Sequence, residues 1–591
     1  MDWMEREQNR RVTGRVIGLV LLVAVLMLGI GFSIGRRSGD DRDERDYITE
    51  VVGEAPRRFE DIEYSRPYIA ALEDKVKAAE QLMADGGDLE TIEAALDECY
   101  EQYYNYDTMY TVAYIRARQD MTDSYYADEL AWTEDNYPRV QQLMEELLYA
   151  AAASDKAREL EEDYFWDGFT EDYADDSNSV YREEIVALMQ QEAELIGEYR
   201  ALNASPSIDT EEGELDFYDY IADKYDEEYL AALMEYYEKY NKEFARIYID
   251  LVKVRAQMAR ELGYDSYEQM QYDYYFERDY TPEQAADYVA DIKQYMVPLY
   301  RAVMADDPYS EISYDAVNDE QLIAVLGDAA RQLGGGIEEA FDFMYDHGFY
   351  DVRLSSTKAA MSFQSYLTDY EAPFLFLNPA GDIEDILSLS HEFGHYADAY
   401  VNYNATETID VSECFSQAME YLMLGYFDGA VSPETLEELQ RLKMLDTLDL
   451  YVQQASFAEF ESRVYSADPE TLSAEMLNDL SLELAKEYGY YDGVNEGYYA
   501  MSWTDITHFF EMPFYVISYP VSNDIAMQVY ELEQQDRGAG LEKYLEILDR
   551  QYPGLIDTVE AGGLQSPFEP GRIEHVVDDL SARLLENKQA A

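Results

Sequence analysis

Apolar residues recur at three- and four-residue intervals through most of the chain between about residues 59 and 350, with acidic residues between them. This spacing places the apolar side chains on one face of an α-helix. It is clearest over residues 68–83, 180–202 and 229–262, which we predict to be amphipathic helices. Prolines and glycines number only 16 and 31 in 591 residues, and strand-like alternation is scarce, so the predicted fold class is mainly α.

Interruptions of the helical pattern predict loops and one short strand. Pro, Ser, Asn and Asp cluster at residues 203–213 and 306–313, and three successive glycines at residues 334–336 indicate a joint between two segments. Residues 372–378 form a short apolar run bounded by turn residues. This run predicts a buried strand in a small sheet.

The N-terminus contains an uncharged run of 20 residues, 16–35, which is long enough to cross a hydrocarbon core about 30 Å thick as a helix. Four arginines precede the run and two follow it. We predict an uncleaved single-pass anchor in the cell membrane, with residues 1–15 cytoplasmic, a charged stalk at residues 36–57 and the catalytic domain extracellular. A cleaved signal peptide is the alternative, but the run exceeds a usual signal core and no A-x-A site closes it.

The most specific pattern is the pentapeptide HEFGH at residues 391–395, which contains two of the five histidines in the chain. Acidic residues followed by an apolar stripe at residues 382–389 predict that it lies on a helix. Residues four apart share a helix face, so His391 and His395 can bind one zinc ion while Glu392 acts as the general base. The alternative is an amphipathic helix with ordinary histidines, which composition alone seldom produces in a chain so poor in histidine.

Two histidines leave zinc short of a third protein ligand, and a second predicted helix at residues 411–421 offers one. A polar loop at residues 402–408 separates it from the first helix, as in an antiparallel helix pair. Glu413 is the candidate ligand. Glu420 lies seven residues further on nearly the same face, and it is either a reserve ligand or a group that orients one.

The HExxH motif followed by Glu413-x-x-Ser416-Gln417 resembles the active site of the oligoendopeptidase F and thimet oligopeptidase family of zinc metallopeptidases. The resemblance implies that Glu413 is the third ligand of one zinc ion per chain. Residues 503–519 are similar to the family's C-terminal segment, whose histidine and tyrosines hold the substrate carbonyl and its oxyanion. The corresponding residues here are His508, Tyr515 and Tyr519.

The same resemblance implies a two-lobed helical fold, with a small β-sheet bordering a deep central cleft. It implies an N-terminal helical lobe at residues 58–350 and a catalytic domain at residues 351–585. It also implies that the strand at residues 372–378 pairs with the substrate backbone. One departure occurs at Asp398, where relatives often have a histidine; because that histidine is no ligand, only the surroundings of the zinc site are affected.

The formal net charge of −82 excludes nucleic acid as a partner, because phosphates would be repelled and no basic stripe exists. Such a surface suits screening by salt, so activity and stability should rise with ionic strength up to a point. The charge also predicts that neutral and cationic peptides are preferred over acidic ones. Cys99 and Cys414 give no disulfide framework, and Cys414 should point away from the metal because its neighbour Glu413 points towards it.

The sequence therefore predicts a membrane-anchored extracellular zinc endopeptidase that hydrolyses short oligopeptides. A zinc exopeptidase, either a carboxypeptidase or a dipeptidyl carboxypeptidase, is an alternative on a similar scaffold. A surface protein that binds peptides without cleaving them is a third hypothesis, against which the intact Glu392 argues. The sequence does not indicate the oligomeric state.

Overall fold

The computed structural model describes residues 58–586, except for residues 167, 175–180, 205, 211–212, 222–225, 403–407 and 551–553. The predicted cytoplasmic tail, membrane helix and stalk at residues 1–15, 16–35 and 36–57 lie outside the described residues. Within the part of the chain that is described, no helix is both long and apolar enough to cross a membrane.

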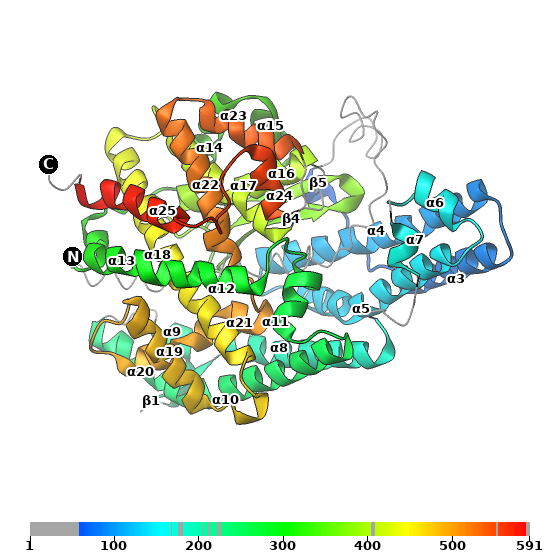
Figure 1. Cartoon of the computed structure of the whole chain (residues 1–591), viewed down its shortest axis with the longest axis horizontal. Coiled ribbons are helices and arrows are strands. Elements are labelled where there is room, and N and C mark those ends of the chain that lie inside the picture. The colour runs from blue at the N-terminus through cyan, green and yellow to red at the C-terminus, as the bar shows by residue number, and fades with distance from the viewer. Residues whose placement is uncertain are drawn as a thin grey trace.

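The first long helices form an arm that projects from one side of the main body (Figure 1). Leu72, Leu96 and Leu143 belong to a hydrophobic core within this arm, whereas the later part of α4, from Met109 to Ala117, belongs to the core of the main body. Because α4 contributes to both cores, it ties the arm to the body. The elements of this region are η2 (Phe59–Asp61), α3 (Ile69–Ala84), α4 (Leu89–Gln119), α5 (Ser124–Ala152), α6 (Ala157–Asp163) and α7 (Phe169–Asp172).

The next segment contains two of the three predicted helices, and α3 of the arm is the other. α8 covers Glu183–Ala204 and α10 covers Asp226–Glu261, close to the predicted bounds. The predicted loop at residues 203–213 was partly wrong, since it contains β1 (Ser207–Thr210) and the start of β2 (Gly213–Asp216), which pair as an antiparallel hairpin. Pro206 directly precedes β1 and Ser207 begins it, so these loop signals fall at the start of the first strand, and both strands are too short to show an alternating pattern. The short helix α9 (Phe217–Ile221) follows directly.

Between α10 and the sheet in sequence lies a run of short helices, of which α12 and α13 cross the middle of the body and α14 and α15 lie near its top in this view (Figure 1). The predicted joint at the three glycines is confirmed, because Gly334 lies between α14 and α15 with a positive φ of 72°. The predicted loop at residues 306–313 includes one 3₁₀ turn, η6. The elements are α11 (Tyr267–Met270), η4 (Gln271–Tyr275), α12 (Pro282–Asp291), η5 (Ile292–Met296), α13 (Val297–Met304), η6 (Pro308–Glu311), α14 (Asp319–Leu333) and α15 (Gly335–His347).

A three-stranded sheet lies beside the helix that bears the HExxH motif. Its strands are β3 (Tyr350–Asp351), β4 (Ser362–Leu367) and β5 (Ala372–Leu377), and the 3₁₀ turn η7 (Thr368–Tyr370) joins the last two. The strand order is β3-β5-β4, with β5 parallel to β3 and antiparallel to β4. The predicted buried strand is confirmed as β5, which is the inner strand of the sheet: β4 pairs along its whole length, and β3 pairs with Leu375 and Phe376 on its other side. The outer strand β4 is the one that begins at the cavity described below.

Helices α18, α22, α23 and α24 pack around α16 and α17, whereas α19 and α20 lie beside α10 in the lower part of the view (Figure 1). A single hydrophobic core runs through this half and into the preceding one, so the fold is mainly helical, as predicted. The proposed lobe boundary at residue 350 stays a prediction. The helices are α16 (Glu384–Asn402), α17 (Ile409–Leu424), α18 (Pro433–Tyr465), η8 (Pro469–Thr471), α19 (Ala474–Tyr488), α20 (Glu496–Met501), η9 (Ser502–Asp505), α21 (Thr507–Glu511), α22 (Ser518–Gln535), α23 (Ala539–Arg550), α24 (Leu555–Gly562), α25 (Arg572–Ser581) and η10 (Ala582–Glu586).

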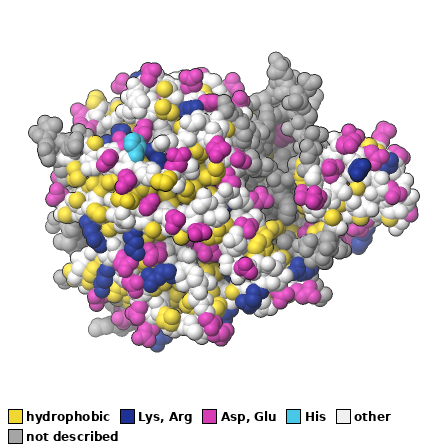
Figure 2. Space-filling model, viewed as in Figure 1, with side chains coloured by type: hydrophobic (Ala, Val, Ile, Leu, Met, Phe, Trp, Pro, Cys, Tyr) yellow, Lys and Arg dark blue, Asp and Glu magenta, His cyan; other side chains and the backbone are white. Residues whose placement is uncertain are grey.

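Acidic side chains are spread over the visible face of both the body and the arm (Figure 2). Hydrophobic side chains lie between them in small groups, and basic side chains are fewer. This distribution agrees with the formal net charge of −82.

Candidate metal centre and active site

The helix that carries the HExxH motif is fixed at both of its ends. At the N-terminal end, the Asp385 carboxylate accepts hydrogen bonds from the backbone N–H groups of Ala380 and Gly381, at 2.8 and 2.7 Å. At the other end, the Asn402 amide donates to Asp398 Oδ1 at 2.8 Å and to the backbone oxygen of Leu548 at 3.1 Å. The predicted helix is therefore confirmed as α16. Asp398 accepts one of the hydrogen bonds that fix its C-terminal end.

Gly394, inside the motif, allows α17 to lie directly against α16. A Cβ atom at this position would lie 2.5 Å from the Cα atom of Ser416 and 2.8 Å from the backbone oxygen of Phe415. Any side chain would therefore force the two helices apart. The contact occurs about one turn of α17 beyond Glu413, so it brings that residue to the histidines.

His391, His395 and Glu413 converge as the sequence predicts. One nitrogen or oxygen atom from each lies within 4.8 Å of the others, and His391 Nε2 is 3.6 Å from Glu413 Oε2. The two imidazole rings are 5.0 Å apart at their centroids. Two imidazole nitrogens and one carboxylate are a ligand set that zinc takes in catalytic sites, so these side chains fit that ion.

Each imidazole is oriented by a hydrogen bond at its Nδ1 atom. His391 Nδ1 lies 2.9 Å from Glu420 Oε1, and His395 Nδ1 lies 3.1 Å from the hydroxyl oxygen of Ser412. Both contacts leave the Nε2 atoms for a metal. Lys443 of α18 in turn donates to Glu420 Oε2 at 2.7 Å. Of the two roles predicted for Glu420, the geometry favours the orienting one.

The charges around His391 favour a cation at this point. Burial by itself lowers the pKa of His391, but the hydrogen bond with Glu420 and the negative charges of Glu413, Glu420 and Glu392 outweigh it and raise the pKa to about 9. Burial also lowers the pKa of Lys443, and the charge of Glu420 again outweighs it, so that pKa is raised. A metal ion would occupy a position where the protein already stabilises positive charge.

Glu392 is 2% exposed and lies between the two histidines on α16. Burial raises the pKa of Glu392 to about 7, with Glu413 and Glu420 raising it further, while His391 and a hydrogen bond with Ser362 of β4 lower it. A carboxyl group with a pKa near neutrality can both take up and release a proton. This suits the general-base role predicted from the motif.

Tyr515 contacts the third candidate ligand directly. Its hydroxyl donates to Glu413 Oε1 at 2.6 Å, and the Ser416 hydroxyl lies 3.2 Å from Glu413 Oε2. The Glu413 carboxylate is thus oriented from two sides. From the sequence, both tyrosines are candidate partners of the oxyanion. In the structure, the Tyr515 hydroxyl already donates to Glu413, so Tyr519 is the better candidate for that role.

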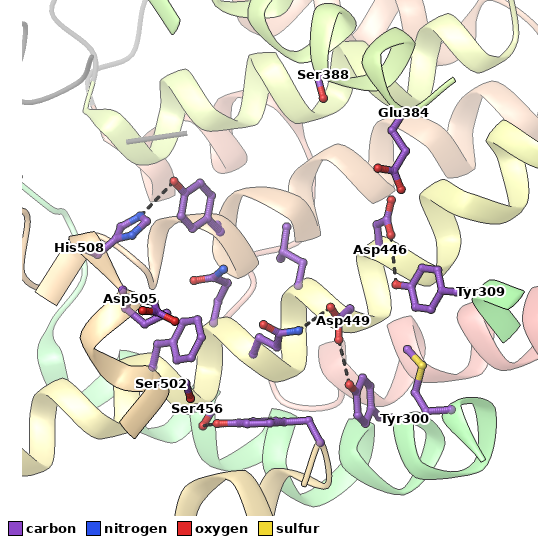
Figure 3. Close-up of a pocket in the computed structure, with 18 of the residues that line it drawn as sticks. Tyr300, Tyr309, Glu384, Ser388, Asp446, Asp449, Ser456, Ser502, Asp505 and His508 are labelled. Carbon is purple, nitrogen blue, oxygen red and sulfur yellow. Dashed lines mark hydrogen bonds between the residues drawn. The ribbon is translucent and has the colours of Figure 1, made fainter. Parts of the chain in front are cut away.

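His508 of α21 and Tyr519 of α22 form the second polar pair of the site. His508 Nε2 lies 3.2 Å from the Tyr519 hydroxyl (Figure 3). Burial holds the pKa of His508 well below its usual value and that of Tyr519 well above its usual value, so both side chains are neutral at pH 7. Neutral donors of this kind can stabilise a developing oxyanion without adding a charge to the resting site.

A cavity of about 1340 Å³ opens on His391, His508 and Tyr519. Apart from the histidines, the basic side chains on its described wall are those of Arg301 and Lys443. The acidic side chains on the wall are far more numerous: Asp307, Asp382, Glu384, Asp385, Glu420, Asp446, Asp449, Asp492 and Asp505.

Two of these carboxylates are fixed by tyrosines on the far side of the cavity from His508 (Figure 3). The Tyr300 hydroxyl donates to Asp449 at 2.9 Å, and the Tyr309 hydroxyl donates to Asp446 at 3.1 Å. Glu384 and Asp446 point towards one another across this part of the cavity (Figure 3). The cavity therefore combines a candidate metal centre with a strongly negative wall.

Two protein-family models match the chain over the residues that build this site and the arm. The model of the peptidase M3 N-terminal domain matches residues 59–170, and the model of peptidase family M3 matches residues 344–550. The chain belongs to peptidase family M3. The second match contains every candidate metal-binding and catalytic residue of this M3 chain.

Named relatives of the M3 chain are oligopeptidases. Oligopeptidase PepF of Bacillus subtilis (strain 168) is 24% identical over 313 residues, which are 49% of this chain and 44% of that protein. The chromosomal oligoendopeptidase F of Lactococcus lactis subsp. cremoris is 24% identical over 371 residues, 56% of this chain and 58% of that protein. The matches thus span about half the length of these relatives. The structure of PZ peptidase A with inhibitor 2 has the same fold, with a TM-score of 0.77 at 23% identity over 90% of this chain and 99% of that chain.

Sequence reasoning missed three residues of the M3 site: Ser362, Ser412 and Lys443. They come from different elements, and only their positions in the fold bring them to Glu392, His395 and Glu420. Cys414 does point away from the ligands, since its thiol donates to the backbone oxygen of Asp410 at 3.2 Å. Gly394 offered one further signal, because a glycine inside a helix indicates a close contact.

We predict that Gly394→Ala lowers the free energy of unfolding by about 1–3 kcal/mol and weakens zinc binding, since the new methyl group overlaps the backbone of α17. Gly197→Ala in α8 is the matched control, because a Cβ atom there meets nothing within 4 Å. The control should be neutral or stabilising by up to about 1 kcal/mol. Urea unfolding and zinc titration measure both quantities. Equal effects of the two substitutions would contradict the proposed helix contact.

We also predict that Glu420→Gln weakens zinc binding roughly 10–100-fold, because the neutral amide holds His391 and Lys443 less strongly than the carboxylate does. Glu437→Gln, at an exposed position of α18, removes the same charge without this contact and should leave the zinc affinity within about twofold of its starting value. Competition titration with a chelator of known affinity measures the change. An unchanged affinity in Glu420→Gln would show that Glu420 does not support the site.

Proposed function

We propose that this M3 chain is a zinc endopeptidase that hydrolyses peptide bonds in short oligopeptides. The observation that carries the proposal is the convergence of His391, His395 and Glu413 beside the buried Glu392, at the wall of a large cavity. The names of the two curated relatives, an oligopeptidase and an oligoendopeptidase, support the same substrate class.

In this proposal, His391, His395 and Glu413 hold one zinc ion. When bound there, zinc would polarise the scissile carbonyl and lower the pKa of a coordinated water molecule to about 7. The chain's own residues then manage protons and charge. Glu392 takes a proton from the attacking water and passes it to the leaving amine, a cycle that its pKa of about 7 permits.

Tyr519 and His508 are the proposed donors to the oxyanion of the tetrahedral intermediate. Both line the cavity beside His391, and both are neutral at pH 7. Loss of one such donor usually lowers kcat about 10²-fold or more. Tyr515 and Glu420 are assigned a different task, since they orient Glu413 and His391 through hydrogen bonds.

We further propose that the chain is anchored in the cell membrane, with its catalytic part outside the cell. This proposal rests on the uncharged run at residues 16–35 and on the arginines that flank it. Short peptides outside the cell would be the substrates in that arrangement.

The proposed activity predicts cleavage of an internally quenched peptide that is blocked at both ends. The purified full-length chain should cleave it, a chelator should abolish cleavage and added zinc should restore it. Glu392→Gln should lower kcat by about 10²–10⁴-fold while retaining zinc, because the amide cannot accept the proton. Glu437→Gln is the matched control and should remain active.

Other outcomes would assign a different function. Trimming of a peptide with free ends, without cleavage of the blocked peptide, would indicate a zinc exopeptidase. Binding of both peptides without turnover by a chain that contains zinc would indicate a peptide-binding protein and would contradict the proposal.

The acidic wall predicts a preference for basic peptides. At low salt, a blocked peptide with flanking lysines should have a kcat/KM at least about tenfold above that of the same peptide with glutamates, and added salt should reduce the ratio. Asp449→Asn should also reduce the ratio, whereas Asp287→Asn, at an exposed position of α12, should not. Equal kcat/KM values for both peptides at low salt would refute this prediction.

A further inference from the structure

Phe514 has a backbone conformation that a bulky residue seldom adopts. Its φ is +67°, in the left-handed region, and it lies between α21 and α22. The other described non-glycine residues with positive φ are Glu277, Asp307 and Glu371, and all three are more exposed than Phe514, which is 4% exposed. A strained residue inside a protein is retained only where its surroundings hold it, and such residues cluster at functional sites.

The left-handed turn at Phe514 makes the side chains of Phe514 and Tyr515 point to different parts of the protein. The Phe514 ring packs against Tyr465 and Tyr267, with centroids 5.0 and 6.4 Å away. The next residue, Tyr515, instead sends its hydroxyl to Glu413 at 2.6 Å. The left-handed turn therefore places Tyr515 on the candidate metal ligand while Phe514 stays in an aromatic cluster.

A buried carboxyl group holds this turn from the neighbouring helix α18. Glu461 is fully buried, and its Oε1 atom accepts the backbone N–H of Phe514 at 3.0 Å. Its Oε2 atom is also buried and has no hydrogen-bond partner among the described residues. Burial raises the pKa of Glu461 to about 8, while the Phe514 hydrogen bond and the charges of Arg255 and Arg278 lower it and Glu268 raises it.

Burying a carboxyl group with one oxygen unpaired lowers the stability of the fold, whereas an apolar side chain of similar size would not. The hydrogen bond to Phe514 is the interaction that it provides in return. The two neighbouring arginines hold the same segment, since Arg255 donates to the backbone oxygens of Phe509 and Phe510 and Arg278 donates to the hydroxyl of Ser518 at 2.9 Å. Arg255 and Arg278, both buried, thus bind the segment that contains His508, Tyr515 and Tyr519.

We propose that Glu461 is a positioning residue for the metal centre: by accepting the Phe514 N–H, it holds the left-handed turn and keeps the Tyr515 hydroxyl on Glu413. The proposal rests on the proposed function, because it assigns Glu413 to zinc. Without Glu461, the turn relaxes, the Tyr515 hydroxyl moves away, and the Glu413 carboxylate loses one of its two orienting contacts.

A double-mutant cycle with Tyr515 tests this proposal. Glu461→Met, which has no acceptor at this point, should weaken zinc binding and lower kcat by about tenfold or more, with KM changed less than about threefold. Glu461→Gln keeps the acceptor oxygen and should stay within about threefold of the wild type in both quantities. In the Tyr515→Phe background, Glu461→Met should add less than about a twofold effect, because the hydroxyl that it positions is already absent.

Glu459→Gln is the matched control, since Glu459 lies on the same helix and its carboxylate contacts Lys293 and Tyr488 instead. It should leave zinc affinity and kcat within about twofold. If Glu461→Met does not fold, Glu461→Asp replaces it, because the shorter side chain withdraws the acceptor from Phe514. Equal losses in the wild-type and Tyr515→Phe backgrounds, or equal losses for Gln and Met at position 461, would overturn the proposal.

The zinc titrations separate this proposal from the proposed function. If the wild type binds zinc but cleaves no peptide, the function fails while the coupling between Glu461 and Tyr515 is still measured through zinc affinity. Peptide cleavage that requires Glu392 would support the proposed function. If, in that case, the effects of Glu461→Met and Tyr515→Phe on zinc affinity and kcat add, the positioning role of Glu461 is refuted.

Discussion

The contact between α16 and α17 at Gly394 is the constraint on which the candidate site depends. The absence of a side chain at Gly394 lets the backbone of α17 lie where a Cβ atom would otherwise be. Only at this separation does the carboxylate of Glu413 reach the two imidazoles of α16. The same closeness brings Glu420 to the far side of His391, so one packing contact sets both a ligand and the group that orients another.

Around this helix pair, buried charged groups also fix the side chains of the site. Lys443 holds Glu420, and Arg278 forms a fully buried ion pair with Asp410 at the start of α17. Buried charges are costly unless they are paired, so such networks are rigid where they are satisfied. This free-energy cost of burying charges is consistent with a site in which a metal ion needs its ligands held in one geometry. The large, acidic cavity lies directly against this site.

The sequence predicted those parts of the fold that depend on local patterns. Helices α3, α8, α10 and α16 follow from apolar spacing, and β5 follows from its apolar run. Helix α17 was predicted from the polar loop before it and from the need for a third zinc ligand. The hairpin of β1 and β2 was missed, because four-residue strands with polar positions resemble a loop. The place of β5 inside the sheet was also missed, since strand order depends on residues distant in sequence.

The candidate site shows the same division. The HExxH motif and Glu413 could be named from spacing and resemblance, because zinc chemistry restricts which residues occur there. Spacing could not show whether Glu420 is a ligand or orients one, because that depends on its contact with His391. It also could not distinguish Tyr515 from Tyr519, because their roles differ only through their contacts with Glu413 and His508. Lys443 and Glu461 have no local signal at all, because each acts through a residue of another segment.

The most direct test of this account is the zinc K-edge X-ray absorption spectrum of the purified, zinc-loaded chain. We predict one zinc ion per chain, bound by two imidazole nitrogens and otherwise only by oxygen atoms at about 2.0–2.2 Å, and the loss of this environment in His391→Ala. A sulfur ligand at about 2.3 Å, or a spectrum unchanged by that substitution, would contradict the assignment of His391, His395 and Glu413 as the metal centre.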